Sequence, residues 1–209
     1  MKKIILILIV FFYNFCFSQI LEGHVQYDIQ VKAIDTSLEI RQQVQLLRNS
    51  KMDLFFSKGK YRVDFKMGEL YSSSTRINKL NDKILTLFNS KKGSFASLNN
   101  TDDANYSEDV SSEIQFFNDK KIILGFNCKK ALIKDKENKT LYWYTTDIQI
   151  EKFKNQIVNP LIPGFPIKFS TIKNGVEMIY SASNFEDSLS TDKKILFSTE
   201  IPPGYQMKK

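Results

Sequence analysis

The sequence has few of the residues that build disulfide scaffolds, metal sites or flexible linkers. Its 209 residues include only two cysteines, one histidine, eight glycines and five prolines. A disulfide-rich scaffold and a metal site built from histidine and cysteine are therefore excluded, and low-complexity linkers are scarce. With 42% hydrophobic and 25% charged residues, the composition is that of a globular chain, which excludes disorder and fibrous repeats.

Long hydrophobic runs are also missing, except for one short run near the N-terminus. Ile4–Phe12 is an unbroken apolar stretch of nine residues behind Lys2 and Lys3. A membrane-spanning helix needs about 20 such residues, so residues 1–19 are predicted to be a secretory signal peptide, cleaved near Ser18. A buried strand and a membrane anchor are the alternatives. Bulky residues directly before Cys16 argue against acylation of that cysteine.

Cleavage of this segment would change both the charge and the cysteine count. Two lysines leave, so the formal charge falls from +7 to +5, and Cys128 becomes the only cysteine. Without an internal disulfide, stability must come from a packed core, which about 190 residues can build. We expect residues 20–209 to form a single β-rich domain, soluble in the periplasm or outside the cell.

Alternating apolar and polar residues, typical of half-buried strands, dominate the rest of the chain. In Gly23–Lys32, for example, Val25, Tyr27 and Ile29 share one face. The other predicted strands are 51–57, 60–67, 70–77, 83–89, 93–98, 121–124, 126–134, 140–146, 165–171 and 176–182. Short connections join most of them, and Asn174-Gly175 favours a tight hairpin turn. About eleven strands are thus predicted, mostly in an antiparallel sheet.

Helical patterns are few. Ser37–Arg48 places Ile40, Val44 and Leu47 on one stripe, and Thr146–Val158 and Ser107–Phe117 are two further predicted helices. So few helices cannot cover a flat sheet of this size. The predicted fold class is therefore mainly β (α+β): a curved antiparallel sheet that forms a half-open barrel, with two or three short helices as plug or lid. A β-sandwich is the alternative.

Four segments resemble a known family of exported bacterial proteins. They are Ile123–Ala131, Tyr142–Ile148, Pro163–Ile167 and Ile201–Tyr205. In these segments the chain, over roughly residues 20–206, resembles the GLPGLI family, which has no known function and is itself similar to the LolA/LolB lipoprotein carriers. This resemblance implies a curved sheet with a helical lid around an apolar cavity, and it implies binding of a lipid or an acyl chain.

Patterns that carry catalysis are absent from the sequence, which contains no paired-carboxylate motif, phosphate-binding glycine loop or nucleophile elbow. A hydrolase would have to use His24, the single histidine. Cys128 is expected to be a buried structural thiol rather than a reactive one. The acidic segment around Asp102 and Glu108 lacks the oxygen spacing of a calcium loop, so a solvated loop is expected. We expect no enzyme, cofactor or metal site.

The basic residues are scattered in pairs such as Lys91/Lys92 and Lys193/Lys194. Export and the lack of a recognition motif argue against nucleic acid as a partner. A solvated surface is the simpler interpretation, and peripheral contact with anionic headgroups or polysaccharide is the alternative.

The sequence therefore predicts a non-catalytic binding protein, with an acyl chain, lipid or lipoprotein as its ligand. The predicted lining residues are Tyr27, Ile29, Phe65, Trp143, Phe165 and Phe169. Lid motion of the helix at 37–48 would control entry. The alternative is a structural or protein-interaction module of the cell envelope, whose apolar face is fully consumed as core.

Overall fold

The computed structural model describes residues 19–35, 37–101, 113–134, 139–151 and 158–208. The predicted signal peptide and the acidic segment around Asp102 and Glu108 lie outside these residues, apart from Gln19. The described strands are β1 (Gly23–Ala33), β2 (Ser50–Ser57), β3 (Lys60–Met67), β4 (Tyr71–Asn78), β5 (Lys83–Ser90), β6 (Gly93–Asn100), β7 (Glu113–Ile123), β8 (Phe126–Lys134), β9 (Lys139–Thr145), β10 (Phe165–Lys173), β11 (Val176–Glu186) and β12 (Gln206–Met207). The described helices are α2 (Leu38–Leu46) and α3 (Lys193–Leu196).

The described strands form one sheet in the order β12-β6-β5-β4-β3-β2-β1-β11-β10-β9-β8-β7. Neighbouring strands are antiparallel, except that β12 runs parallel to β6. Asn174 and Gly175 have φ angles of 50° and 74°, which is the tight turn that their sequence predicts. The mainly β, antiparallel prediction is confirmed, and the β-sandwich alternative is wrong because one continuous sheet is present.

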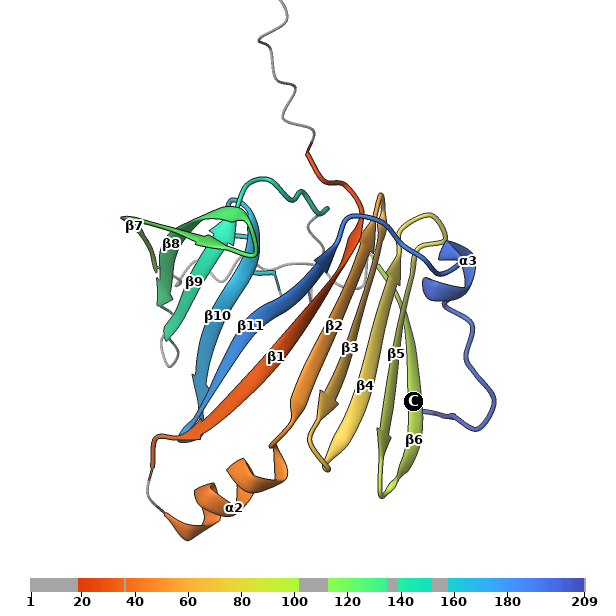
Figure 1. Ribbon diagram of the computed structural model, residues 1–209. Coiled ribbons are helices and arrows are strands. Elements are labelled where there is room, and N and C mark those ends of the chain that lie inside the picture. Colours follow the sequence, from red (N-terminus) through yellow and green to blue (C-terminus); the bar gives the residue numbers. More distant parts are fainter. Residues whose placement is uncertain (1–18, 36, 102–112, 135–138, 152–157, 209) are drawn as a thin grey trace, which may run out of the picture.

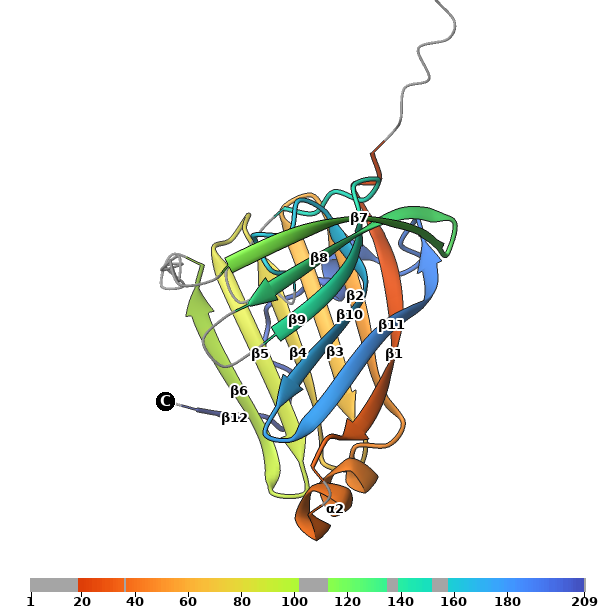
Figure 2. The same cartoon turned by 90° about the vertical axis from the view of Figure 1, so that its left-hand side faces the viewer.

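The sheet bends until its inner face meets itself (Figures 1 and 2). Phe56 on β2 and Phe165 on β10 lie three strands apart, which is about 14 Å along a flat sheet. Their ring centroids are only 5.7 Å apart. Phe126 on β8 and Phe185 on β11 are likewise three strands apart, with centroids separated by 5.0 Å. Since no described ladder joins β7 to β6 or β12, the half-open barrel that the sequence predicts is confirmed.

We call the end of the sheet that holds the start of β1 the upper end, and the end beside α2 the lower end (Figure 1). The upper end is closed by extended chain. Ile20 and Ile148 form a parallel bridge there, and Ile148, Val158 and Ile162 are buried. The described part of the predicted helix Thr146–Val158 is not helical, so this helix prediction is wrong for residues 146–151 and 158.

The helices differ from their predictions in position and length. Ser37 caps α2, as predicted, by accepting a hydrogen bond from the backbone amide of Ile40. Ile40 and Val44 are only half-buried, however, whereas Leu47 just after the helix is buried. The predicted helix Ser107–Phe117 is wrong over residues 113–117, which belong to β7. The four-residue helix α3 lies on the outer face of the sheet and had no clear sequence pattern.

The surroundings of Gly164 explain why the Pro163-Gly164 motif has glycine at its second position. A Cβ atom at this position would overlap the carbonyl oxygen of Thr145 at the end of β9. The backbone of Gly164 does not need a positive φ angle. Glycine is therefore required for the close approach of two chain segments rather than for a special turn.

We expect Gly164→Ala to lower the free energy of unfolding by more than about 2 kcal/mol, because one of the two segments must move to relieve the overlap. The control is Gly125→Ala, where φ is +80° but no atom lies within 4 Å of the new Cβ. The control should cost only the strain of a left-handed residue, about 1 kcal/mol. Urea unfolding measures both variants, and equal losses would contradict the close-approach interpretation.

Candidate ligand-binding face

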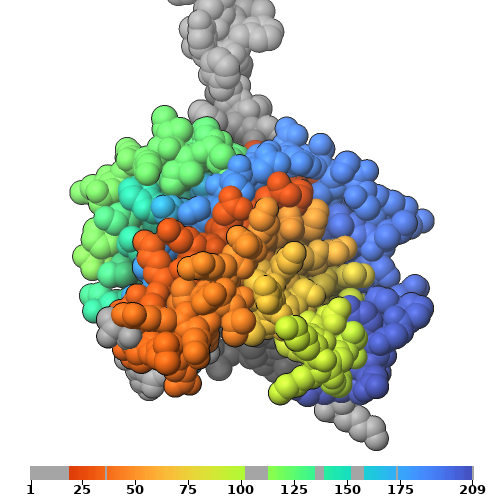
Figure 3. Space-filling view, turned by 60° about the horizontal axis from the view of Figure 1, so that its bottom comes forward, coloured from red at the N-terminus to blue at the C-terminus, as the bar shows by residue number. Residues whose placement is uncertain are grey.

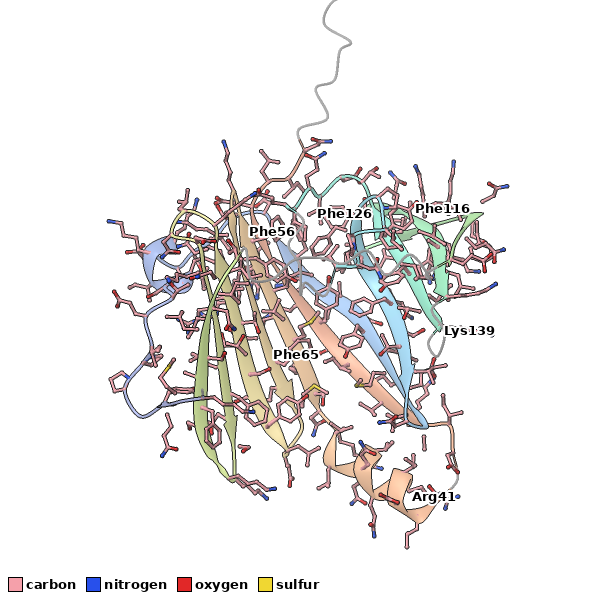
Figure 4. The ribbon with its side chains drawn as sticks, turned by 180° about the vertical axis from the view of Figure 1, so that it is seen from behind. Arg41, Phe56, Phe65, Phe116, Phe126 and Lys139 are labelled. Atoms are coloured by element: carbon pink, nitrogen blue, oxygen red, sulfur yellow. The ribbon has the colours of Figure 1, made fainter. Side chains whose placement is uncertain are left out.

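The concave face of the sheet carries a band of aromatic and apolar side chains, which we call the aromatic band. Strand register places its members side by side: each pairs with a member on the next strand, except on β1, where Ile29 pairs with Tyr180 and Tyr27, two residues earlier, pairs with Met52. The members are Tyr142, Phe169, Tyr180, Ile29, Tyr27, Met52, Phe65, Ser73, Phe88 and Phe95. Figure 4 shows the concave face with Phe56 and Phe65 among its side chains.

Aromatic rings stack along one part of this band. Phe169 lies parallel to Tyr180, with ring centroids 4.4 Å apart, and is stacked on Tyr142 at 5.7 Å. Tyr27 meets Phe169 edge-on at 6.2 Å. The hydroxyl of Tyr27 donates a 2.6 Å hydrogen bond to the carbonyl oxygen of Pro166. These contacts make β9, β10, β11 and β1 a closely packed, dry wall.

The pKa values of the tyrosine hydroxyls indicate that this wall is shielded from water. Burial raises the pKa of Tyr142 to about 12, and it raises the pKa of Tyr180 to about 12 as well. The charge of Tyr71, on the far side of the bend, contributes to the raised pKa of Tyr180. Tyr71 is on β4 and Tyr180 on β11, four strands apart. Tyr71 packs against the same buried cluster that contains Tyr180, so the two walls face each other across the concave side.

On β4 and β5, burial falls from the upper end of the concave face towards the lower end, whereas Met67 on β3 stays buried at the lower end. Phe56, Tyr61 and Phe165 at the upper end are almost fully buried. Near the lower end Phe65, Tyr71 and Phe95 are half-buried, and Phe88 is 37% exposed. Tyr71 and Phe88 stack on each other at 5.0 Å. Seen from below, the surface is hollowed between α2 and the β5–β6 turn (Figure 3). On β3–β6 the accessible aromatic surface is therefore at the lower end, whereas on β7 Phe116 is 53% exposed at the level of Phe126 (Figure 4).

The structure brings five of the six predicted lining residues to the concave face. Tyr27, Ile29, Phe165 and Phe169 are buried there, and Phe65 is half-buried.

Trp143 lies on the opposite face. It pairs with Lys130 and Lys168, which point outward, and the ammonium of Lys130 lies 5.8 Å from its ring centroid. In a strand, successive side chains alternate between faces, so Trp143 cannot share the face of Tyr142.

Sequence reasoning missed the accessible part of the band. Tyr71, Phe88 and Phe95 lie opposite the predicted residues and complete the lower end. An alternation signal existed for Phe95 and Ser97, but β5 has apolar residues at adjacent positions, Ile84 with Leu85 and Leu87 with Phe88. Its inner face therefore could not be chosen from the pattern alone.

His24 and Cys128, which by residue type could act as a base and a nucleophile, lie apart from the aromatic band. His24 is on the outer face, where Nε2 lies 2.8 Å from a carboxylate oxygen of Asp53 and the ring stacks on Phe55 at 4.1 Å. Cys128 is buried, as predicted, and burial raises the pKa of its thiol to about 11. Within the described residues no group of three His, Cys, Asp or Glu side chains could hold a metal ion.

These features define a protein built from one strongly bent β-sheet whose concave face is aromatic. The chain belongs to the family described as "Domain of unknown function (DUF4412)", whose model matches residues 37–205. Among curated proteins, none matches this sequence. In the described residues no helix is long and apolar enough to cross a membrane.

Solved structures share the fold at low sequence identity. PNGF-II in its P21 crystals is 16% identical with a TM-score of 0.53, over 90% of this chain and 32% of that one. In its C2 crystals the TM-score is 0.51, over 88% and 30%. The chain thus spans about a third of PNGF-II.

Two further solved structures are much weaker matches. The Mycobacterium tuberculosis lipoprotein LppX is 10% identical with a TM-score of 0.38, over 81% of this chain and 89% of that one. A LolA superfamily protein from Nitrosomonas europaea is 10% identical with a TM-score of 0.24, over 85% and 90%. Likenesses this weak carry no argument about ligand or function.

The raised tyrosine pKa values predict that the protein loses stability in alkali. Tyr142 stays neutral in the folded state up to a pKa of about 12, whereas in the unfolded chain it ionises near 10. The unfolded state thus releases its proton first, and the free energy of unfolding falls above pH 10. Between pH 9 and 11.5, Tyr142→Phe should remove about 2 kcal/mol of this fall, as measured by urea unfolding.

Absorbance at 295 nm gives an independent measurement of the same groups. The folded protein should show phenol ionisation that is incomplete at pH 11, and Tyr142→Phe should reduce the late part. Protein in concentrated urea, where every phenol is solvated, is the control and should titrate near 10. A folded protein whose phenols all titrate by pH 11 would contradict the dry wall described above.

Proposed function

We propose that this chain is an exported, non-catalytic binding protein that holds an acyl chain of a lipid or lipoprotein against the lower part of its concave face. The observation that carries the proposal is the contrast in burial along that face. Phe65, Tyr71 and Phe88 keep accessible surface, while the rings above them are buried. An apolar chain placed there would gain about 0.8 kcal/mol for each methylene removed from water.

Export rests on the predicted signal peptide at residues 1–19, with the periplasm or the outside of the cell as the destination. The resemblance of four segments to the GLPGLI family and, through it, to lipoprotein carriers supports the same compartment and ligand class. Peripheral contact with a membrane would suffice for loading. In this proposal the ligand is bound by desolvation, so neither a cofactor nor a metal ion takes part.

The helix α2 is suited to control entry at the lower end. Its residues include none that are buried, and Leu38 is largely exposed. It is held at its ends, where the amide of Glu69 donates to the carbonyl oxygen of Leu46 and Ile40 approaches Gly175 in the β10–β11 turn. A helix attached this loosely can move with little loss of packing.

One observation favours a second candidate, a structural or protein-interaction module of the envelope. The upper half of the interior is filled by direct ring contacts such as Phe56 with Phe165. If the lower half is filled in the same way in solution, no ligand would enter. The experiment below separates the two candidates.

Binding of a dansyl-labelled undecanoic acid tests the proposal. We expect its emission to shift to the blue on binding to the protein. Ser73→Trp, between Phe65 and Phe88 on the concave face, should weaken binding about tenfold or more, because a large ring occupies the space of the ligand. The matched control is Ser94→Trp, which faces outward from β6 beside Asn89 and should leave binding unchanged.

Circular dichroism establishes that both variants are folded. Native mass spectrometry of protein purified from its host gives a second readout, because a bound lipid adds mass. A clean mass together with no uptake of the dansyl probe would sink the carrier proposal and favour the envelope module. Equal binding by both tryptophan variants would place the probe elsewhere on the protein.

A further inference from the structure

A second concavity has its charged lining on the convex face of the sheet, although Phe65, Tyr71 and Ser73 of the strands beneath also border it. We call it the outer groove. It has a volume of about 680 Å³ and runs over β2, β3, β4 and β5, from the β3–β4 turn to the C-terminal segment at Pro202 and Tyr205. A volume of this size lies within the range of small-molecule sites.

The floor of the outer groove pairs two arginines directly across strands. Arg62 on β3 lies opposite Arg76 on β4. Like charges at directly opposite positions destabilise a sheet, so this pairing carries a cost. The charge of Arg62, together with burial as the larger cause, lowers the pKa of Arg76.

The two arginines differ in how their charges are compensated. The guanidinium of Arg62 contacts the carboxylate of Asp64 at 2.7 Å and also lies over the Phe55 ring. Arg76 donates only to neutral acceptors, the carbonyl oxygen of Ser198 at 3.0 Å and the hydroxyl of Ser74 at 3.4 Å. Among the described residues, no carboxylate forms an ion pair with Arg76.

The carboxylates near the groove are already engaged or lie at its rim. Asp53 accepts hydrogen bonds from His24 and Gln26, and Asp64 is held by Arg62. Glu69 is exposed in the β3–β4 turn. Lys66, also exposed, adds a positive charge at the rim without a described ion pair. Asp64 offsets part of the charge of Arg76 from a distance, but no described carboxylate contacts the guanidinium, so an anion entering the groove would meet Arg76 as a charge without a direct ion-pair partner.

The other lining groups suit a ligand that carries several hydroxyl groups. Ser72 and Ser74 offer hydroxyls along β4. Tyr205, at the end near the C-terminus, presents a half-buried ring and interacts electrostatically with Arg76. Hydroxyl groups beside an amphipathic ring provide hydrogen bonds and an apolar contact together.

We propose that the outer groove binds a hydroxyl-rich organic anion, such as a sugar acid or a sugar phosphate, whose carboxylate or phosphate pairs with Arg76. Guanidinium binds both anions with charge-assisted, bidentate hydrogen bonds. The same chemistry occurs in a free sugar anion and in a hydroxylated anionic headgroup of a lipid. The proposal does not depend on the acyl-chain function, since Arg76 alternates along β4 with Ser73 and Thr75 and faces away from the aromatic band.

Isothermal titration with glucuronate and glucose 6-phosphate tests the free form, with glucose as the neutral comparison and inorganic phosphate as the bare anion. We expect both sugar anions to bind and glucose not to bind, with phosphate alone weaker than glucose 6-phosphate. Flotation with phosphatidylglycerol vesicles, against phosphatidylcholine vesicles, tests the lipid-bound form. Binding in either form that depends on Arg76 supports the proposal.

Arg76→Gln should weaken binding about tenfold or more, because it removes the charge but keeps a donor for Ser198. The matched control is Arg48→Gln, an exposed arginine beyond α2 and outside the groove, which should bind like wild type. If Arg76→Gln fails to fold, the variants Lys66→Gln and Ser74→Ala test the proposal instead. Each should weaken anion binding about two- to threefold.

The proposal is overturned if wild type binds none of these anions at millimolar concentration, or if glucose binds as well as glucose 6-phosphate. It is also overturned if a folded Arg76→Gln binds like wild type. Equal affinity for inorganic phosphate and glucose 6-phosphate would show an unspecific anion contact and would overturn the sugar-like specificity.

Discussion

The bend of the sheet is the constraint on which the rest of the structure depends. A single antiparallel sheet with one apolar face must hide that face, and here no second sheet is available to cover it. The inner face therefore covers itself, with Phe56 against Phe165 and Phe126 against Phe185. These contacts join strands that are three places apart in the sheet. Their loss would therefore open the bend of the sheet and would not be limited to the packing of one side chain.

The contacts by which the inner face of the sheet covers itself are not distributed evenly along the strands. At the upper end the bend is tight enough for rings to touch, and extended chain around Ile148 and Ile162 fills what remains. At the lower end Phe65 and Phe88 keep part of their surface, and α2 adds few buried atoms. This bent sheet thus has a filled upper end and, on β4 and β5, a partly accessible lower end.

The sequence predicted the strands and the bend better than it predicted the side of each residue. Strict alternation in β1 and β3 identified Tyr27, Ile29 and Phe65 as inner residues, and the structure places them on the concave face. Trp143 could not be placed, because Tyr142 and Tyr144 flank it with residues of the same kind. In β5, Leu85 and Leu87 are buried on the outer face beneath Ile201 and Tyr205, a contact made by residues more than 100 positions away.

The C-terminal segment covers part of the outer face of β3, β4 and β5, so this face is not fully exposed to solvent. Arg62 and Arg76 hold the carbonyl oxygens of Leu196 and Ser198, and β12 then pairs with β6. β3 and β4 present Phe65 and Ser73 inward, and they present Arg62, Arg76 and Ser74 outward. Because alternate residues of one strand reach opposite faces, the side chains of Ser73 and Ser74 point in opposite directions although they are neighbours in the chain. A single layer of sheet therefore separates an aromatic inner face from a charged and hydroxylated outer face.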